Sequence, residues 1–205
     1  MANKEYVKIF ARFERFWHWA QALLVMTLLF TGGRLHGLFE LWGKLPWKAA
    51  FVVHLGAAAA IIVLWVFAIF WHFTTGEWRQ YLPSMDRLGA VIRFYAYGIF
   101  RGEPHPAKPT LRRKHNPLQR LSYLFLKLVI NPAIWLTGVL YLSVNLTGLP
   151  LAQVAWAHVV AAYAMATFVV IHVYMATTGD TVGAYLKAMI TGYEWVETDG
   201  DPRKA

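Results

Sequence analysis

Residues 128–179 read LVINPAIWLTGVLYLSVNLTGLPLAQVAWAHVVAAYAMATFVVIHVYMATTG and contain no Asp, Glu, Lys or Arg. These 52 residues are too many for one membrane-spanning helix, because a bilayer core needs only roughly 20 helical residues. The segment Asn145–Pro150 interrupts the run with residues that are typical of a turn. The stretch therefore predicts two membrane helices, near residues 119–143 and 154–178.

Two more charge-free runs precede this stretch. The first has 18 residues between Arg15 and Arg34, and the second has 28 residues, from 49 to 76. They predict helices near residues 16–36 and 49–73, and their continuous apolar character excludes the alternating pattern of a membrane β-barrel. We therefore expect an all-α membrane protein, a bundle of four transmembrane helices in a single domain of residues 1–205.

The composition supports a membrane protein and excludes several other classes. Of the 205 residues 58% are hydrophobic and 15% are charged, whereas soluble domains carry about 25% charged residues. A two-domain soluble enzyme, a disordered protein and a nucleic-acid binder are therefore excluded. The chain has no cysteine, which excludes disulfides, thiolate zinc sites, iron–sulfur ligation and covalently attached haem.

Basic residues predict the orientation of the chain. Sixteen Lys and Arg residues lie in the N-terminal segment, the 74–118 loop with Arg120, and the tail, against three on the other side. By the positive-inside rule, both termini and the 74–118 loop are expected in the cytoplasm, with the protein in the bacterial inner membrane. Apolar residues at helical spacing predict short interfacial helices around 88–99 and 181–190, and residues 197–205 are expected to form a solvated tail.

Four histidines fall inside the predicted spans, at two matched depths. His18 and His172 are expected near the cytoplasmic ends of their helices, and His54 and His158 near the outer ends. His158 and His172 are 14 residues apart, which places them within about 40° on one helical face and roughly 21 Å apart. Each could give one axial imidazole to a haem, with the second from a neighbouring helix: His18 for the inner haem and His54 for the outer. The pattern predicts two haem b groups between helices.

Other interpretations of the histidines remain open. A single histidine near a helix end is often interfacial or hydrogen-bonded, and His72 lies at the inner level as the main rival of His18 for the ligand position. His36 is expected at a helix end, and His105 and His115 in the basic loop are expected at the surface.

Three rival functions come from other classes. A transition-metal transporter would need histidines that converge with carboxylates or methionines, and the predicted spans contain no Asp or Glu. In a haem-free structural membrane anchor, replacing His158 would leave assembly and the absorption spectrum unchanged. A self-contained transmembrane reductase would take electrons from a cytosolic donor and work without a partner subunit.

Several motifs resemble one known family. Residues 15–19 (RFWHW), His54, the His158 and His172 pair, and residues 115–120 (HNPLQR) resemble the prokaryotic cytochrome b561-type membrane subunits. That family includes the gamma subunit of membrane formate dehydrogenase, the b-type cytochrome of nickel–iron hydrogenases and the thiosulfate reductase cytochrome b. The similarity spans residues 6–180.

The resemblance implies a function. It implies a dihaem b-type cytochrome that moves electrons between the quinone pool, menaquinone or ubiquinone, and a periplasmic redox subunit with iron–sulfur, multihaem or molybdenum chemistry. The implied haem iron ligands are His18 and His172 for the inner haem and His54 and His158 for the outer. The implied quinone site contains Asn116, Gln119 and His172, while a helix N-cap is the structural alternative for Asn116. Substrate chemistry would lie in the partner, so this chain would be the electron-transfer subunit.

Overall fold

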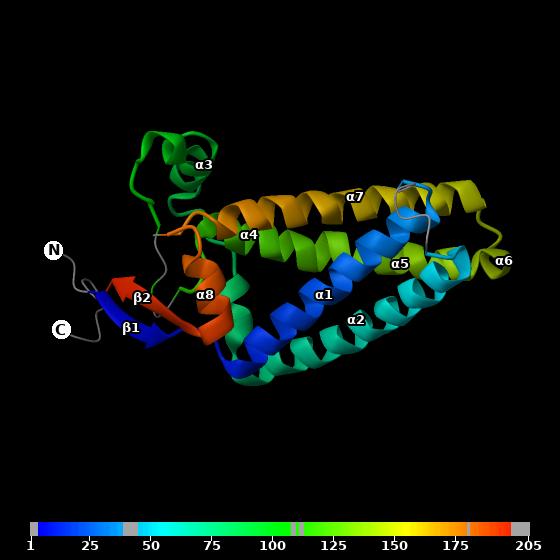
Figure 1. Cartoon of the computed structure of the whole chain (residues 1–205), viewed down its shortest axis with the longest axis horizontal. Coiled ribbons are helices and arrows are strands. Elements are labelled where there is room, and N and C mark those ends of the chain that lie inside the picture. The colour runs from blue at the N-terminus through cyan, green and yellow to red at the C-terminus, as the bar shows by residue number, and fades with distance from the viewer. Residues whose placement is uncertain (1–3, 39–44, 108–109, 111–112, 180, 198–205) are drawn as a thin grey trace. The chain divides into compact units, whose positions relative to one another are not determined.

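The computed structural model describes residues 4–38, 45–107, 110, 113–179 and 181–197. The described chain is mostly helical (Figure 1). Its contacts divide the chain into two compact units, residues 10–78 and residues 1–9 with 79–205. The single-domain interpretation stays a prediction, and the expected tail beyond residue 197 lies outside the described residues.

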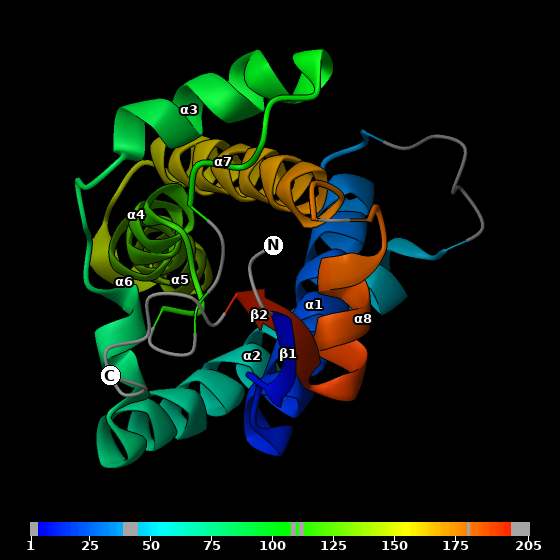
Figure 2. The same ribbon diagram turned by 90° about the vertical axis from the view of Figure 1, so that its left-hand side faces the viewer.

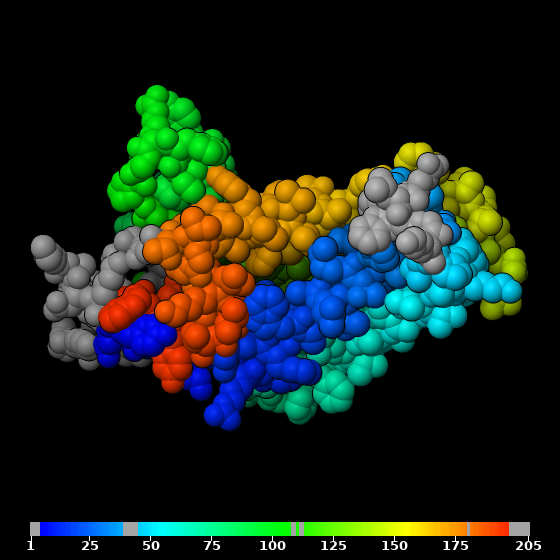
Figure 3. All heavy atoms as spheres, in the orientation of Figure 1, coloured from blue at the N-terminus to red at the C-terminus, as the bar shows by residue number. Residues whose placement is uncertain are grey.

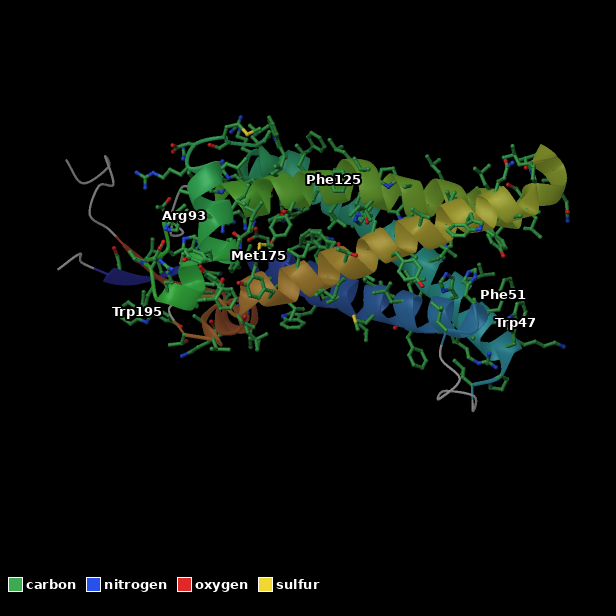
Figure 4. The ribbon with its side chains drawn as sticks, turned by 90° about the horizontal axis from the view of Figure 1, so that it is seen from above. Trp47, Phe51, Arg93, Phe125, Met175 and Trp195 are labelled. Carbon is green, nitrogen blue, oxygen red and sulfur yellow. The ribbon has the colours of Figure 1, made fainter. Side chains whose placement is uncertain are left out.

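Two long helices, α1 (Arg12–Leu35) and α2 (Trp47–Thr75), pack against each other in the first unit. α1 begins where Glu14 Oε2 accepts a hydrogen bond of 2.6 Å from the Ala11 N–H. α2 ends at Gly76, whose left-handed φ of 77° favours glycine. At the start of α2 the rings of Trp47 and Phe51 stack 5.4 Å apart (Figure 4). The predicted helices 16–36 and 49–73 are confirmed as helices with slightly longer bounds.

The second unit contains the other long helices. The predicted helix 119–143 consists of three consecutive segments, α4 (Pro117–Phe125), the π-helical turn η4 (Leu126–Ile130) and α5 (Asn131–Leu142). Pro132 lacks a backbone N–H and so cannot complete the regular α-helical ladder, which accounts for the irregular turn just before it. After α6 (Val144–Thr147) and Gly148, α7 (Leu151–Ala176) returns alongside α5.

Shorter elements lie at one end of this unit. α3 (Leu88–Ala96) and the 3₁₀ turn η3 (Gly98–Arg101) form the lobe beyond α7 in Figure 3. Val91, Phe94 and Tyr95 of α3 are buried against Met175, which α7 supplies at its C-terminal end (Figure 4). The helix expected around 88–99 is therefore confirmed as α3, which ends at Ala96 and has one face in a small protein core. Its place at the membrane surface stays a prediction.

The ends of the described chain form a two-stranded antiparallel ribbon that the sequence did not predict. β1 (Lys4–Lys8) pairs with β2 (Tyr193–Glu197), with Tyr6 opposite Trp195. Figure 2 shows the helix α8 (Ala184–Thr191) beside this ribbon. The helix expected around 181–190 is thus confirmed, whereas β2 occupies part of the segment that leads into the expected tail.

Three helical segments of the described chain are long and apolar enough to cross a membrane: Trp47–Thr75, Pro117–Leu142 and Leu151–Ala176. α1 has 24 residues, and at 1.5 Å per residue it could also reach across. Its first turns, however, carry Arg12, Glu14 and Arg15. That α1 is the fourth spanning helix stays a prediction.

Candidate functional site

His54 on α2 lies against a Thr-Gly pair on α1. The Thr31 Oγ1 and His54 Nδ1 atoms are 2.8 Å apart, and the Thr31 side chain is buried. The same hydroxyl donates a 2.7 Å hydrogen bond to the carbonyl oxygen of Thr27, one turn earlier. The imidazole is therefore held at Nδ1 by a side chain that its own helix also fixes.

His158 on α7 has the same surroundings in the second unit. Its Nδ1 lies 3.0 Å from Oγ1 of Thr137 on α5. The Thr137 hydroxyl in turn donates a 2.6 Å hydrogen bond to the Ala133 carbonyl. The two histidines that the sequence assigned to one depth are thus held in the same way by two different helix pairs.

A glycine follows each threonine and brings the helix backbone close to the imidazole. A Cβ atom at Gly32 would lie 3.3 Å from Cε1 of His54, and one at Gly138 would lie 3.4 Å from Cε1 of His158. The first distance is shorter than an ordinary contact and the second is at the short limit of one, so each glycine leaves little room between its backbone and the ring. Sequence reasoning missed these four residues, although the dipeptide Thr-Gly precedes each histidine by a similar interval.

His172, near the C-terminal end of α7, has aromatic neighbours. Its ring stacks on Phe168, with centroids 5.9 Å apart and an angle of 9°, and Tyr123 of α4 lies 6.0 Å away. Beyond Tyr123 lies His115, with centroids 5.1 Å apart. This cluster joins the predicted ligand His172 to the HNPLQR segment that begins at His115.

His18, near the start of α1, and His72, near the end of α2, lie at the same end of the first unit. His18 makes an edge contact with Trp19, with ring centroids 5.1 Å apart. His72 is only 5% exposed, and its Nδ1 lies 2.6 Å from the Ala68 carbonyl of its own helix. Trp17 meets the His72 ring edge-on at 5.2 Å. Packing therefore buries the His72 imidazole.

Asn116 is the N-cap of α4. Its Oδ1 accepts a 2.9 Å hydrogen bond from the Gln119 N–H, and Gln119 Oε1 accepts one of 3.0 Å from the Asn116 N–H. Pro117 occupies the first helical position, where its missing N–H costs nothing. Asn116 and Gln119 thus form a reciprocal capping box, which confirms the capping alternative for Asn116.

The other end of the Asn116 amide reaches a polar cluster around Tyr95. Asn116 Nδ2 donates to the Tyr95 hydroxyl at 3.0 Å, and His105 Nε2 lies 3.1 Å from the same oxygen. Burial raises the pKa of Tyr95, while hydrogen bonds from Thr178 and Asn116 act in the opposite direction. The Asn116 side chain is only 7% exposed.

Both loop histidines, expected at the surface, are half-buried and pack against aromatic rings. The His105 ring meets Phe94 at a centroid distance of 4.7 Å, and the His115 ring meets Tyr81 at 5.7 Å. Burial lowers the pKa of His115 to about 3, and the positive charges of Lys114, Lys127 and Arg120 lower it further. His115 is therefore neutral at physiological pH.

Lys127 places a cation on the π-helical turn within a membrane-capable segment. Its Nζ lies 3.1 Å from the centroid of the Tyr81 ring, and such a cation–π contact offsets part of the cost of removing the charge from water. Sequence reasoning passed over this lysine, which lies one residue before the charge-free run 128–179.

Among the residues that the structure describes, no three His, Asp or Glu side chains converge as a bare metal ion would require. The arrangement instead offers separate imidazoles, each oriented by its own helix pair. The pairing of a histidine from one unit with a histidine from the other stays a prediction.

Comparison with known proteins gives the family. The family described as prokaryotic cytochrome b561 matches residues 9–192. The protein named "Putative cytochrome YdhU" of Escherichia coli (strain K12) is 29% identical over 197 residues, which cover 92% of this chain and 75% of that protein. No solved structure matches the chain. The family match covers most of the chain and agrees with its membrane-capable helices, and the chain belongs to the prokaryotic cytochrome b561 family, whose members are multi-pass membrane cytochromes that bind haem b and transfer electrons.

Proposed function

We propose that this chain is a dihaem b-type membrane cytochrome that carries electrons between the quinone pool and a periplasmic redox partner. In this proposal His54 and His158 hold the outer haem, and His18 and His172 hold the inner haem. The chain would anchor its partner, an iron–sulfur, multihaem or molybdenum protein, at the outer face of the inner membrane. Substrate chemistry would belong to that partner.

The repeated contact of threonine with histidine carries this proposal. His54 and His158 come from different helix pairs, yet each is held at Nδ1 by a threonine on the neighbouring helix. Ligand histidines usually make such a hydrogen bond at the ring nitrogen that does not bind the metal. The donor set also fits haem b chemically, because neutral imidazoles are ligands of haem iron and two of them would hold a haem that supplies electron transfer.

His172 is suited to a haem near the cytoplasmic side. Phe168 stacks on its ring and Tyr123 lies beside it, so both the ring orientation and an apolar surrounding are supplied by its own unit. His18 of α1 is the proposed partner, and His72, whose Nδ1 lies 2.6 Å from the Ala68 carbonyl and whose ring packs among tryptophans, is its rival. Haem b, when bound, supplies one-electron transfer, and these residues hold and orient it.

We place the quinone site at the start of α4, with Asn116, Gln119 and His172 as its residues and menaquinone or ubiquinone as the substrate. A quinone carbonyl needs hydrogen-bond donors. The Asn116 amide carries two N–H groups, one of which reaches Tyr95. Next to Asn116, the Tyr95 hydroxyl contacts the His105 imidazole, and both groups can exchange protons. Both termini and the 74–118 loop would then face the cytoplasm, in line with the distribution of basic residues.

Histidine substitutions test the ligand assignment. His54→Ala and His158→Ala should each remove one haem, so that the haem content per chain falls by half while the other haem keeps its spectrum. His72→Ala is the matched control and should keep both haems. The measurement is pyridine haemochrome quantitation on each purified, membrane-inserted variant. Loss of both haems or of neither in the first two variants would refute their pairing, and loss of a haem in His72→Ala would show that His72 is a ligand.

A further inference from the structure

The hydroxyl protons of Thr31 and Thr137 are already used. A threonine hydroxyl has a single proton to donate. In Thr31 that proton goes to the Thr27 carbonyl at 2.7 Å, and in Thr137 it goes to the Ala133 carbonyl at 2.6 Å. A carbonyl oxygen can only accept, so the direction of these two bonds is fixed.

The direction of the next bond follows. Since each hydroxyl proton points to a carbonyl, the threonine oxygen can only accept at its contact with imidazole, 2.8 Å for His54 and 3.0 Å for His158. With the hydroxyl protons assigned to the carbonyls, both imidazoles carry their proton on Nδ1. In a neutral imidazole this puts the lone pair on Nε2, which is the form that can bind iron through Nε2.

We propose that Thr31 and Thr137 are positioning residues that fix the tautomer of His54 and His158 and tune how strongly these imidazoles donate electrons to iron. The inference rests on the proposed function, in which both histidines hold the outer haem. A hydrogen bond accepted from Nδ1–H gives the ring partial imidazolate character, which makes it a stronger donor. Such a ligand favours oxidised iron, so the two threonines lower the reduction potential of that haem.

The threonine hydroxyls do not need the contacts with imidazole to complete their own hydrogen bonding. Thr27, one turn before Thr31 on α1, makes the same kind of bond to the Leu23 carbonyl at 2.9 Å. Thr27 and Thr31 also border the same apolar hollow of about 400 Å³. A threonine at this depth is therefore accommodated by its own helix, and the additional contact to imidazole is specific to the Thr-Gly positions.

The experiment compares isosteric, conservative and control variants of the full-length haem-loaded protein. Thr31→Val and Thr137→Val remove the acceptor, Thr31→Ser and Thr137→Ser keep it, and Thr27→Val is the matched control. The readouts are haem content, the low-spin ferric spectrum and a redox titration that resolves both haems. Loss of one haem in His54→Ala identifies the outer one.

We expect each valine variant to retain two haems and to raise the potential of the outer haem alone. At a fixed ambient potential the ratio of reduced to oxidised outer haem should rise roughly two- to tenfold, a tenfold change being about 59 mV. In the double variant that carries both valines, the fold-change in this ratio should be the product of the two single fold-changes. Serine variants and Thr27→Val should titrate like the parent. A haem that is lost on valine substitution and regained with serine would support the same contact.

Different failures overturn different claims. A parent chain without haem overturns both the proposed function and this inference. Two haems with unchanged potentials in both valine variants overturn the inference alone, as does a shift or haem loss that serine does not reverse. A shift of one haem by Thr31→Val and of the other by Thr137→Val would support the role of the threonines and contradict the pairing of His54 with His158.

Discussion

The oxygen and the nitrogen of the Asn116 side-chain amide make different hydrogen bonds, one to the start of a helix and one to a tyrosine. Its oxygen caps α4 through the Gln119 N–H, and its nitrogen donates to the Tyr95 hydroxyl. A cap residue and a quinone ligand would require different atoms of this one side chain. The two roles can therefore be separated by substitution.

We predict that Asn116→Ala and Asn116→Asp both impair quinol oxidation while haem content stays at the parent level. Alanine also removes the cap and should cost about 0.5–2 kcal/mol of stability, whereas aspartate keeps an oxygen that can accept from the Gln119 N–H. The measurements are quinol turnover and thermal unfolding in detergent. Turnover at the parent rate in Asn116→Asp would leave Asn116 as a cap only.

His115 makes stability depend on pH. Its pKa is about 3 in the folded chain against an ordinary value of 6.5, so folding favours the neutral ring. The contribution of His115 to the free energy of unfolding is fully present above about pH 6.5. It is lost as the pH falls from there toward 3, because His115 of the unfolded chain takes up a proton first. We predict that the thermal midpoint falls between about pH 7.5 and 5, and that His115→Phe flattens this dependence. The exposed His36 provides the control variant His36→Gln.

At the residue scale, the sequence singled out candidate side chains but did not show how they are held. Matched depth singled out His54 and His158, because helical spacing alone sets depth. Thr31 and Thr137 escaped notice, since their role depends on which face of one helix meets another helix. His105 and His115 were expected at the surface for the same reason: local polarity does not reveal the aromatic neighbours Phe94 and Tyr81.

Among the elements, the long helices follow from hydropathy and the irregular ones from tertiary contacts. The predicted 119–143 helix is interrupted by the turn η4, and only the position of Pro132 hinted at this. The ribbon of β1 and β2 joins segments from opposite ends of the chain. No local sequence pattern predicts such a pairing, because a lone two-stranded ribbon is only marginally stable without support from neighbouring elements.

α3 offers a test of packing at the scale of one element. Val91 is fully buried against the core that includes Met175, whereas its neighbour Ile92 is 47% exposed. Val91→Ala should destabilise the packing of α3 by about 2 kcal/mol, from lost apolar burial and the resulting cavity. Ile92→Ala is the control and should change stability by about 0.5 kcal/mol or less. Hydrogen exchange of residues 88–96 measures both, and equal protection in the two variants would contradict this packing of α3.

For the whole molecule, composition and family agree on a multi-pass membrane cytochrome that binds haem b. Few charged residues and long apolar runs indicated the membrane, because a bilayer leaves few alternatives to an apolar helix. The number of haems, the quinone and the partner do not follow from these features. They depend on surfaces and on how histidines of the two units combine.

The most direct test of the central claim is haem stoichiometry of the purified chain in detergent. A reduced-minus-oxidised spectrum with pyridine haemochrome quantitation should give two haem b groups per chain. Their bands should be those of six-coordinate, low-spin haem, as expected for two imidazole ligands on each iron. No haem, or a single haem per chain, in a folded and membrane-inserted preparation would contradict the account.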